Sequence, residues 1–251
     1  MTDLHEILSA FEGVPLDILD KRAALLRRVD NKYAVGTTEF EQLLARLADD
    51  HQVLEIDGNR EFRYSTTYFE TPDLRCFIDH VEDRVPRFKA RARCYEDSDA
   101  CVFEVKLKRS GDETDKRQID YATGDRRRLT DEAWDCLRSA LEQVGLDPPE
   151  KLGPILTTEF ERVTLAAREG SERLTCDFGV RLTGADGQAA RMRSDLVLAE
   201  TKSESGTSPA DRELQNMQLQ PISLSKYRVG MSLVGGAAGY GEQPGSELFV
   251  R

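Results

Sequence analysis

Basic residues recur at every second position of one short segment, and this pattern restricts the fold more than any other feature of the sequence. Residues 87–95 read R-F-K-A-R-A-R-C-Y, so the cations alternate with small or apolar side chains. Successive side chains of a β-strand point to opposite faces, whereas a helix would mix the two kinds. The segment therefore predicts a strand with one cationic face and one apolar face.

A second segment of the same kind follows almost at once. Residues 102–108 read V-F-E-V-K-L-K and place Glu104, Lys106 and Lys108 on one side of a strand. Only residues 96–100 connect the two segments, which predicts a β-hairpin. If the strands pair so that their apolar faces coincide, their charged faces coincide as well.

The alternating charges have two interpretations. A charged face usually lies against solvent in an antiparallel sheet. However, residues 196–202 again carry an E-x-K pair within an apolar strand, and Lys116 and Arg162 also lie in strand-like segments. Like charges side by side on a sheet repel, whereas a barrel of about eight strands can enclose a ligand. The repetition therefore favours a barrel with an anion in its interior.

Hydrophobic periodicity predicts an α+β fold with helices packed outside the strands. Eight strands are expected, at 29–36, 61–70, 86–95, 101–109, 115–121, 155–166, 173–183 and 195–202. Helices are expected after Thr38 and after Thr130, near the N-terminus, and at 209–219. We expect residues 1–235 to form one domain and the glycine-rich residues 236–251 to be a mobile C-terminal tail.

Composition excludes several classes of protein. The net charge of −11 argues against a general nucleic-acid binder, so any anion site must be local. Five cysteines without a C-x-x-C pair indicate reduced thiols rather than a disulfide framework or a zinc site. We expect no membrane insertion and a cytoplasmic location, because the sequence has neither a long apolar segment nor a basic leader. The three histidines are assigned no chemistry, and the oligomeric state stays open.

Several short motifs, in this order, resemble the VTC polyphosphate polymerase domain of the triphosphate tunnel metalloenzyme (CYTH-like) superfamily. They lie within about residues 20–235 and read R-R-V-D-N-K-Y (27–33), Y-F-E-T-P-D-L (68–74), R-F-K-A-R-A-R-C-Y (87–95), F-E-V-K-L-K (103–108), D-K-R (115–117), E-F-E-R (159–162), A-E-T-K-S (199–203) and L-S-K-Y (224–227). Simpler tunnel hydrolases and class IV-like adenylyl cyclases carry E-x-E-x-K on the first strand. Residues 28–32 read R-V-D-N-K instead, which favours the VTC branch.

The resemblance implies an antiparallel, eight-stranded triphosphate tunnel barrel with packing helices outside. It implies that phosphates bind to the catalytic residues Lys32, Arg91, Arg93, Lys106, Lys116, Arg162, Lys202 and Lys226. Lys89, Lys108 and Arg181 are further candidates for cofactor binding. Glu200 is expected to be the chief metal ligand, with Glu104 and Asp177 as further candidates for a divalent Mn²⁺ or Mg²⁺ ion. Lys106 and Lys202 each follow a glutamate by two residues, so they could also be cross-strand salt-bridge partners in a structural network.

The implied function is that of a metal-dependent phosphotransferase. ATP would donate its terminal phosphoryl group to a growing polyphosphate chain. The expected partners of the protein are therefore ATP and inorganic polyphosphate or triphosphate. Two alternatives stay open: a tripolyphosphatase or nucleoside triphosphatase of the same fold, and a non-catalytic polyphosphate-binding module. Because phosphoryl transfer depends mainly on positioning and on stabilising charge on phosphate oxygens, the same basic residues would serve either reaction.

Overall fold

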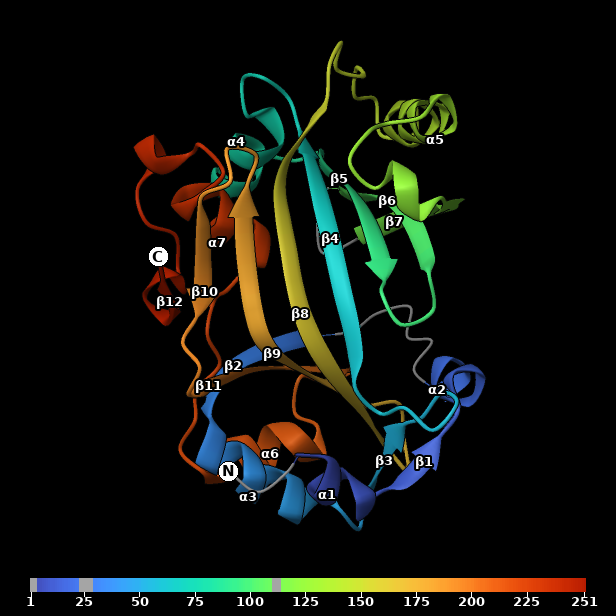
Figure 1. The fold of residues 1–251 in the computed structure, drawn as a ribbon, viewed down its shortest axis with the longest axis vertical. Helices are drawn as coiled ribbons and strands as arrows, with labels where there is room; N and C mark the ends of the chain where they lie inside the picture. The colour runs from blue at the N-terminus through green and yellow to red at the C-terminus, as the bar shows by residue number, and fades with distance from the viewer. Residues whose placement is uncertain (1–3, 23–28, 110–113) are drawn as a thin grey trace. The chain divides into compact units, whose positions relative to one another are not determined.

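The computed structural model describes residues 4–22, 29–109 and 114–251, and Figure 1 shows their arrangement. Arg27 and Arg28 of the first motif lie outside these residues. The described strands are β1 (Glu12–Val14), β2 (Val29–Gly36), β3 (His51–Leu54), β4 (Phe62–Glu70), β5 (Arg87–Tyr95), β6 (Ala100–Lys108), β7 (Thr114–Tyr121), β8 (Gly153–Ala167), β9 (Arg173–Gly184), β10 (Ala189–Met192), β11 (Leu196–Ser203) and β12 (Phe249–Val250).

The described residues also form α-helices and short 3₁₀ turns. The helices are α1 (Leu4–Ser9), α2 (Leu16–Arg22), α3 (Thr37–Leu47), α4 (Arg75–Val81), α5 (Asp131–Glu142), α6 (Pro209–Asn216) and α7 (Lys226–Leu233), with the 3₁₀ turns η1 (Thr123–Asp125), η2 (Ala238–Tyr240) and η3 (Ser246–Leu248). The four predicted helices are confirmed as α1, α3, α5 and α6. Local sequence explains two of their starts, because the hydroxyls of Thr130 and Ser208 accept hydrogen bonds from the first turns of α5 and α6.

The fold is α+β, as predicted, but its sheet has twelve strands in the described residues rather than eight. All eight predicted strands are present, with bounds within two residues of the prediction. The additional strands β1, β3, β10 and β12 contain two to four residues each, too few for an alternating pattern to be recognised. The pairs β2–β11, β9–β11, β9–β10, β3–β8, β4–β5, β5–β6 and β6–β7 are antiparallel, whereas β1 and β3 pair in parallel. Closure of the sheet into a barrel stays a prediction.

The chain forms two compact units, and each has its own core. The first contains Met1–Phe62, Phe160–Val180 and Met192–Ser223. Its core lies between helices α1, α3 and α6 and one face of β2, β9 and β11, and its buried residues include Tyr33, Leu44, Cys176, Ala199 and Leu214. The apolar stripe of α3 therefore covers one face of these strands and leaves the other face for polar side chains.

The second unit contains Arg63–Glu159, Arg181–Arg191 and Leu224–Arg251. Here α5 packs against the apolar face of β5, β6 and β7. Figure 1 shows the position of α5 beside these strands. Its core includes Phe88, Ala90, Phe103, Leu107 and Leu137. The alternating pattern of the sequence thus has the predicted result, with one face of the hairpin buried under a helix.

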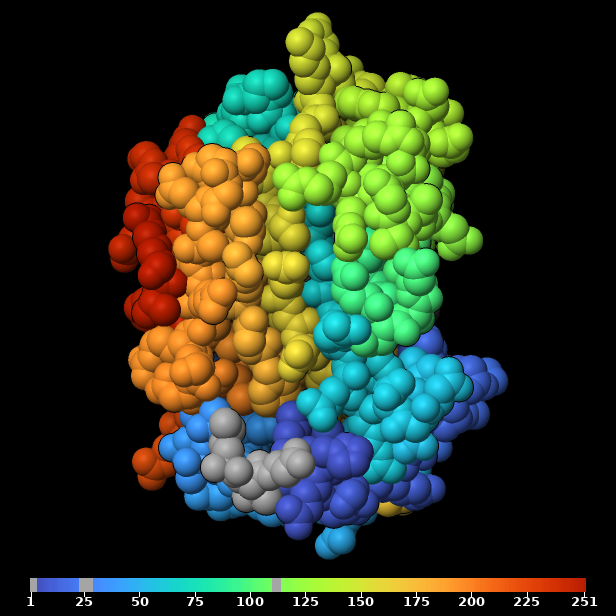
Figure 2. Space-filling model, viewed as in Figure 1, coloured from blue at the N-terminus to red at the C-terminus, as the bar shows by residue number. Residues whose placement is uncertain are grey.

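The C-terminal residues of this unit include the short elements η2, η3 and β12. Strand β12 is next to β10 in the sheet, and Phe249 is buried. Figure 2 shows the C-terminal segment, in red, lying along the orange surface of β10 and the end of β9. Whether residues 236–251 are mobile stays a prediction.

The cysteines differ from the expectation of reduced thiols. Cys94 and Cys101 form a disulfide between β5 and β6, and Cys76, Cys136 and Cys176 are free. The reason is the register of the hairpin, which places Cys94 directly opposite Cys101. In the described part of the chain, no helix is long and apolar enough to span a membrane.

Candidate functional site

The charged faces of β5, β6 and β7 coincide in the second unit, as the hairpin prediction required. Lys89 lies opposite Lys106, which lies opposite Lys116, so three lysines form one row across three strands. The next row along β5 pairs Arg91 with Glu104. Like charges directly opposite each other destabilise a sheet. The lysine row is therefore an unfavourable arrangement for the protein alone and a favourable one for a bound anion.

Glu104 is the carboxylate around which the cations of this face gather. Its oxygens lie 2.6 Å from Arg91, 3.4 Å from Lys116 and 4.0 Å from Arg93. Burial alone would raise the pKa of the Glu104 carboxyl, but the guanidinium groups of Arg91 and Arg93 hold this pKa below its usual value. The carboxylate is ionised at neutral pH and acts as a counter-ion.

A second charged face lies in the first unit, on the side of β2 and β11 opposite the core. Glu200 pairs with Lys32 across the two strands, and their charged groups are 3.5 Å apart. Lys202, two residues along β11, lies 2.8 Å from the same carboxylate. Burial would raise the pKa of the Glu200 carboxyl, yet Lys202 and Lys32 hold it far below its usual value. Lys202 is thus a salt-bridge partner of Glu200 within β11 rather than across two strands.

Arg162 and Asp177 form a bidentate ion pair in the same unit. The guanidinium nitrogens of Arg162 donate to the two carboxylate oxygens of Asp177 at 2.6 and 2.9 Å. The guanidinium also lies over the ring of Phe160, with its carbon 5.0 Å from the ring centroid. These contacts fix the plane of the guanidinium, and such a fork suits oriented oxygens of carboxylate or phosphate.

One buried carboxylate secures the core-facing side of these strands. Asp211, at the start of α6, accepts hydrogen bonds from Asn31 at 3.1 Å, Tyr33 at 2.8 Å and Thr201 at 2.7 Å. It also accepts a bond from the backbone of Ser208 at 2.9 Å, which completes a capping box. Because Asn31 and Tyr33 flank Lys32, and Thr201 lies between Glu200 and Lys202, this network fixes the backbone that carries the charged face.

The remaining predicted residues are Lys106, Lys108, Lys226 and Arg181. Lys106 is exposed within the lysine row, and Lys108 lies opposite Arg87. Lys226 is the first residue of α7. Arg181 lies on the exposed side of β9, opposite Arg191 of β10. Arg181 therefore has weaker structural support as a cofactor-binding residue than the residues of the lysine row.

The carboxylates do not form a metal site by themselves. In residues 4–22, 29–109 and 114–251, no group of three or more His, Cys, Asp and Glu side chains could hold a metal ion. However, Mg²⁺ commonly binds through one or two carboxylates together with substrate phosphates, and Mn²⁺ prefers the same oxygen donors. Glu200 fits that kind of shared site best. Its side chain is 19% exposed, whereas those of Glu104 and Asp177 are 5% and 3% exposed.

Sequence reasoning missed four residues that support the charged faces. They are Asp211, which lies in a polar helix, and His80, Glu70 and Tyr227, which lie around Lys89. Tyr227 stands within the quoted motif L-S-K-Y, and Glu70 within Y-F-E-T-P-D-L. These two positions could have been noticed, whereas nothing in the local sequence distinguishes Asp211 or His80.

Comparisons with known proteins agree with the motifs. The model of the VTC domain matches residues 27–234 and confirms the resemblance. No curated protein matches the chain.

Two solved structures are distantly similar to this chain. A putative adenylyl cyclase from Hippeastrum, reported with a dominant triphosphatase activity, is 15% identical with a TM-score of 0.49; the match covers 82% of this chain and 96% of that one. The protein PH1819 from Pyrococcus horikoshii OT3 is 10% identical with a TM-score of 0.42, over 80% and 93% of the two chains. Both are too distant to assign an activity.

Proposed function

Because the chain belongs to the VTC domain family, we propose that it is a polyphosphate polymerase. It transfers the terminal phosphoryl group of ATP to a growing chain of inorganic polyphosphate and releases ADP. The proposal includes the triphosphate tunnel barrel expected for this family, with the charged strand faces inside.

The observation that carries the proposal is the crowding of cations on strands that also hold the family motifs. Lys89, Lys106 and Lys116 lie abreast, and the neighbouring arginines Arg91 and Arg93 share one buried carboxylate. The Glu104 carboxylate lies beside Arg91, Arg93 and Lys116, so one acid contacts three cations of this face. A polyanion with regularly spaced charges would turn the repulsion between the cations into attraction.

In this reaction no side chain of the protein needs to form a covalent bond with the substrate. A terminal oxygen of the polyphosphate attacks the γ-phosphorus of ATP, a new P–O bond forms, and the bond between the γ-phosphorus and the bridging oxygen of ADP breaks. Arginine side chains orient phosphate oxygens through paired N–H donors, and lysines add positive charge as the oxygens become more negative. On the opposite face of β2 and β11, Asp211 keeps Lys32 and Lys202 in place.

A divalent ion is part of the proposal, with Glu200 as its principal protein ligand. When bound, the ion neutralises charge on the phosphate oxygens and helps to orient them. Glu200 suits this role because a metal ligand must be ionised. Burial would raise the pKa of its carboxyl, but Lys202 and Lys32 lower this pKa by more. Glu104 and Asp177 are better explained as counter-ions, since each pairs closely with an arginine.

The second candidate function is hydrolysis of a triphosphate, in which water takes the place of the polyphosphate end. The same cations would serve it, so the charged faces alone do not distinguish the two reactions. A non-catalytic binding module would need the cations but not a carboxylate suited to a metal. Glu200 therefore favours an enzyme over a binding module.

The test measures which product receives the labelled phosphate of ATP. Purified protein is incubated with ATP labelled in the γ-phosphate and with Mn²⁺ or Mg²⁺, and the label is measured in long polymer and in free phosphate. ATP labelled in the α-phosphate is the matched control, since its label must stay in ADP. Label in long polymer supports the polymerase. Label in free phosphate alone would establish the hydrolase instead, and no release of either product would leave only a binding module.

A further inference from the structure

Lys89 differs from the other cations of its strand in what surrounds it. Its ammonium group is 2.9 Å from Nε2 of His80, in α4, and 5.1 Å from the centroid of the Tyr227 ring, in α7. Among the described residues, no carboxylate forms an ion pair with it. Lys89 is therefore held by a neutral ring nitrogen and an aromatic face, which position the charge without neutralising it.

The charges around this position are positive. Burial and then Lys89, Arg87 and Arg228 lower the pKa of His80 to about 2, so this ring is neutral and accepts the hydrogen bond from Lys89. Burial and the cations Lys106 and Arg91 also lower the pKa of Lys89. An anion bound here would remove this mutual repulsion.

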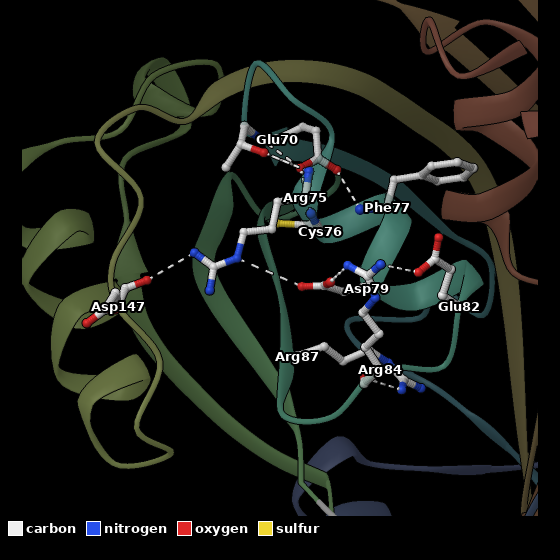
Figure 3. Close-up of polar contacts among 10 residues, drawn as sticks. Glu70, Arg75, Cys76, Phe77, Asp79, Glu82, Arg84, Arg87 and Asp147 are labelled. Carbon is white, nitrogen blue, oxygen red and sulfur yellow. Dashed lines mark hydrogen bonds and ion pairs between the residues drawn. The ribbon is translucent and has the colours of Figure 1, made fainter. Parts of the chain in front are cut away.

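The carboxylate of Glu70, which contacts Tyr227, accepts several hydrogen bonds from other groups. Figure 3 shows Glu70 beside the start of α4, where its carboxylate accepts backbone hydrogen bonds from Cys76 and Phe77, each at 3.0 Å. It also accepts bonds from the backbone and hydroxyl of Thr71 and from the hydroxyl of Tyr227. Glu70 thus fixes α4 and Tyr227, which carry the two groups that hold Lys89.

We propose that Lys89, held by His80 and Tyr227, is a separate subsite for one phosphate group of a linear polyphosphate. The inference rests on the proposed function and adds the direction in which the bound polyphosphate chain runs. Lys89 and Arg91 lie on the same face of β5 two residues apart, which separates them by about 6.6 Å along the strand. One phosphate group at Arg91 would not occupy Lys89 as well. The polyphosphate therefore runs along β5, and Lys89 binds chains that extend beyond Arg91.

The experiment compares chain lengths. Binding of pyrophosphate, tripolyphosphate and a long polyphosphate of defined length is measured by calorimetry for the wild type and for Lys89→Met. A charge-assisted contact contributes about 1.5–3 kcal/mol, which corresponds to a roughly 10- to 100-fold change in affinity. We expect that loss for the long polyphosphate and a loss of less than about threefold for pyrophosphate, which the arginines can hold alone.

Two further variants make the result specific. Lys151→Met removes an exposed lysine from the same unit and should change none of the affinities, which controls for net charge. Lys89→Gln repeats the test with a polar side chain, and thermal unfolding of each variant confirms that it is folded. An equal loss for all chain lengths, or no loss for the long chain, would overturn the subsite. Failure of the wild type to bind any of the three ligands would instead refute the proposed function.

Discussion

Replacing Glu104 by glutamine tests how the cations of β5–β7 are held when no phosphate is bound. The substitution keeps the shape of a side chain that is only 5% exposed and removes its charge. Arg91, at 2.6 Å, and Lys116, at 3.4 Å, then lose their shared counter-ion. The ligand-free variant should be less stable than the wild type, because cations that were paired now repel one another.

The magnitude depends on how exposed the cations are. Removing one partner of a fully buried ion pair costs about 3–5 kcal/mol. Here the side chains of Arg91 and Lys116 are 20% and 53% exposed, so solvent screening reduces the expected loss to about 2–3 kcal/mol. For a chain of this length, 1 kcal/mol changes the melting temperature by about 2–4 °C, which gives a decrease of roughly 4–12 °C.

The assay measures thermal unfolding with and without tripolyphosphate, and calorimetric binding of the same ligand. Tripolyphosphate should restore most of the lost stability and should bind Glu104→Gln more tightly than the wild type, because no carboxylate competes for the cations. Glu96→Gln is the matched control, since Glu96 and Arg126 form a more exposed pair in the same unit. Its stability should change by no more than about 0.5 kcal/mol.

Two results would refute this reasoning. An unchanged melting temperature would mean that Glu104 does not neutralise the cations. Weaker tripolyphosphate binding in the presence of metal, with normal binding in its absence, would mean that Glu104 is a metal ligand after all.

The ion pairs of Glu104 also predict that the stability of the folded protein depends on pH in acid. The pKa of Glu104 is lowered in the folded protein, whereas an unfolded glutamate has a pKa of about 4.3. Its contribution to stability is therefore complete above about pH 4.3 and is lost as the pH falls through the lower pKa of the folded state. The difference in melting temperature between the wild type and Glu104→Gln should be constant near neutral pH and should shrink below about pH 4.

Three further substitutions address the other parts of the account. Arg93→Ala should lower turnover by roughly 10²–10³-fold while ligand-free stability holds or rises, because a crowded cation is removed; near-normal turnover with a large fall in melting temperature would contradict this. Glu200→Gln should abolish metal-dependent turnover but retain polyphosphate binding, and unchanged turnover would identify a different carboxylate as the ligand. Asp211→Asn should lower the free energy of unfolding by about 1–3 kcal/mol in urea titrations, because a buried acceptor of several hydrogen bonds loses its charge.

The β5–β6 hairpin could be predicted from the sequence because its alternation reports directly which side chains share a face. The partners of each charge could not, since they depend on register. Arg91 lies opposite Glu104 only because the connection between the strands sets the pairing, and the same register joins Cys94 to Cys101. Counting back from that connection would have found the disulfide, whereas cysteine spacing alone did not.

The residues that hold the charged side chains in place could not be predicted from the sequence for a different reason. Asp211 is distant in sequence from Asn31 and Tyr33, and only the packing of α6 on β2 and β11 brings them together. His80 is half-buried in a short helix with no motif of its own, so its contact with Lys89 depends on how Glu70 fixes α4. Tertiary contacts of this kind leave no periodic signal in either segment.

The most direct test of the central claim is a crystal structure with bound tripolyphosphate, in which the positions of the phosphorus atoms are measured. The account predicts phosphate oxygens within hydrogen-bond distance of Arg91 and Arg93, on the charged face of β5, with the apolar face still covered by α5. Phosphates bound only to exposed arginines elsewhere, with the β5–β6 face free of ligand, would contradict the assignment of this face as the phosphate-binding surface.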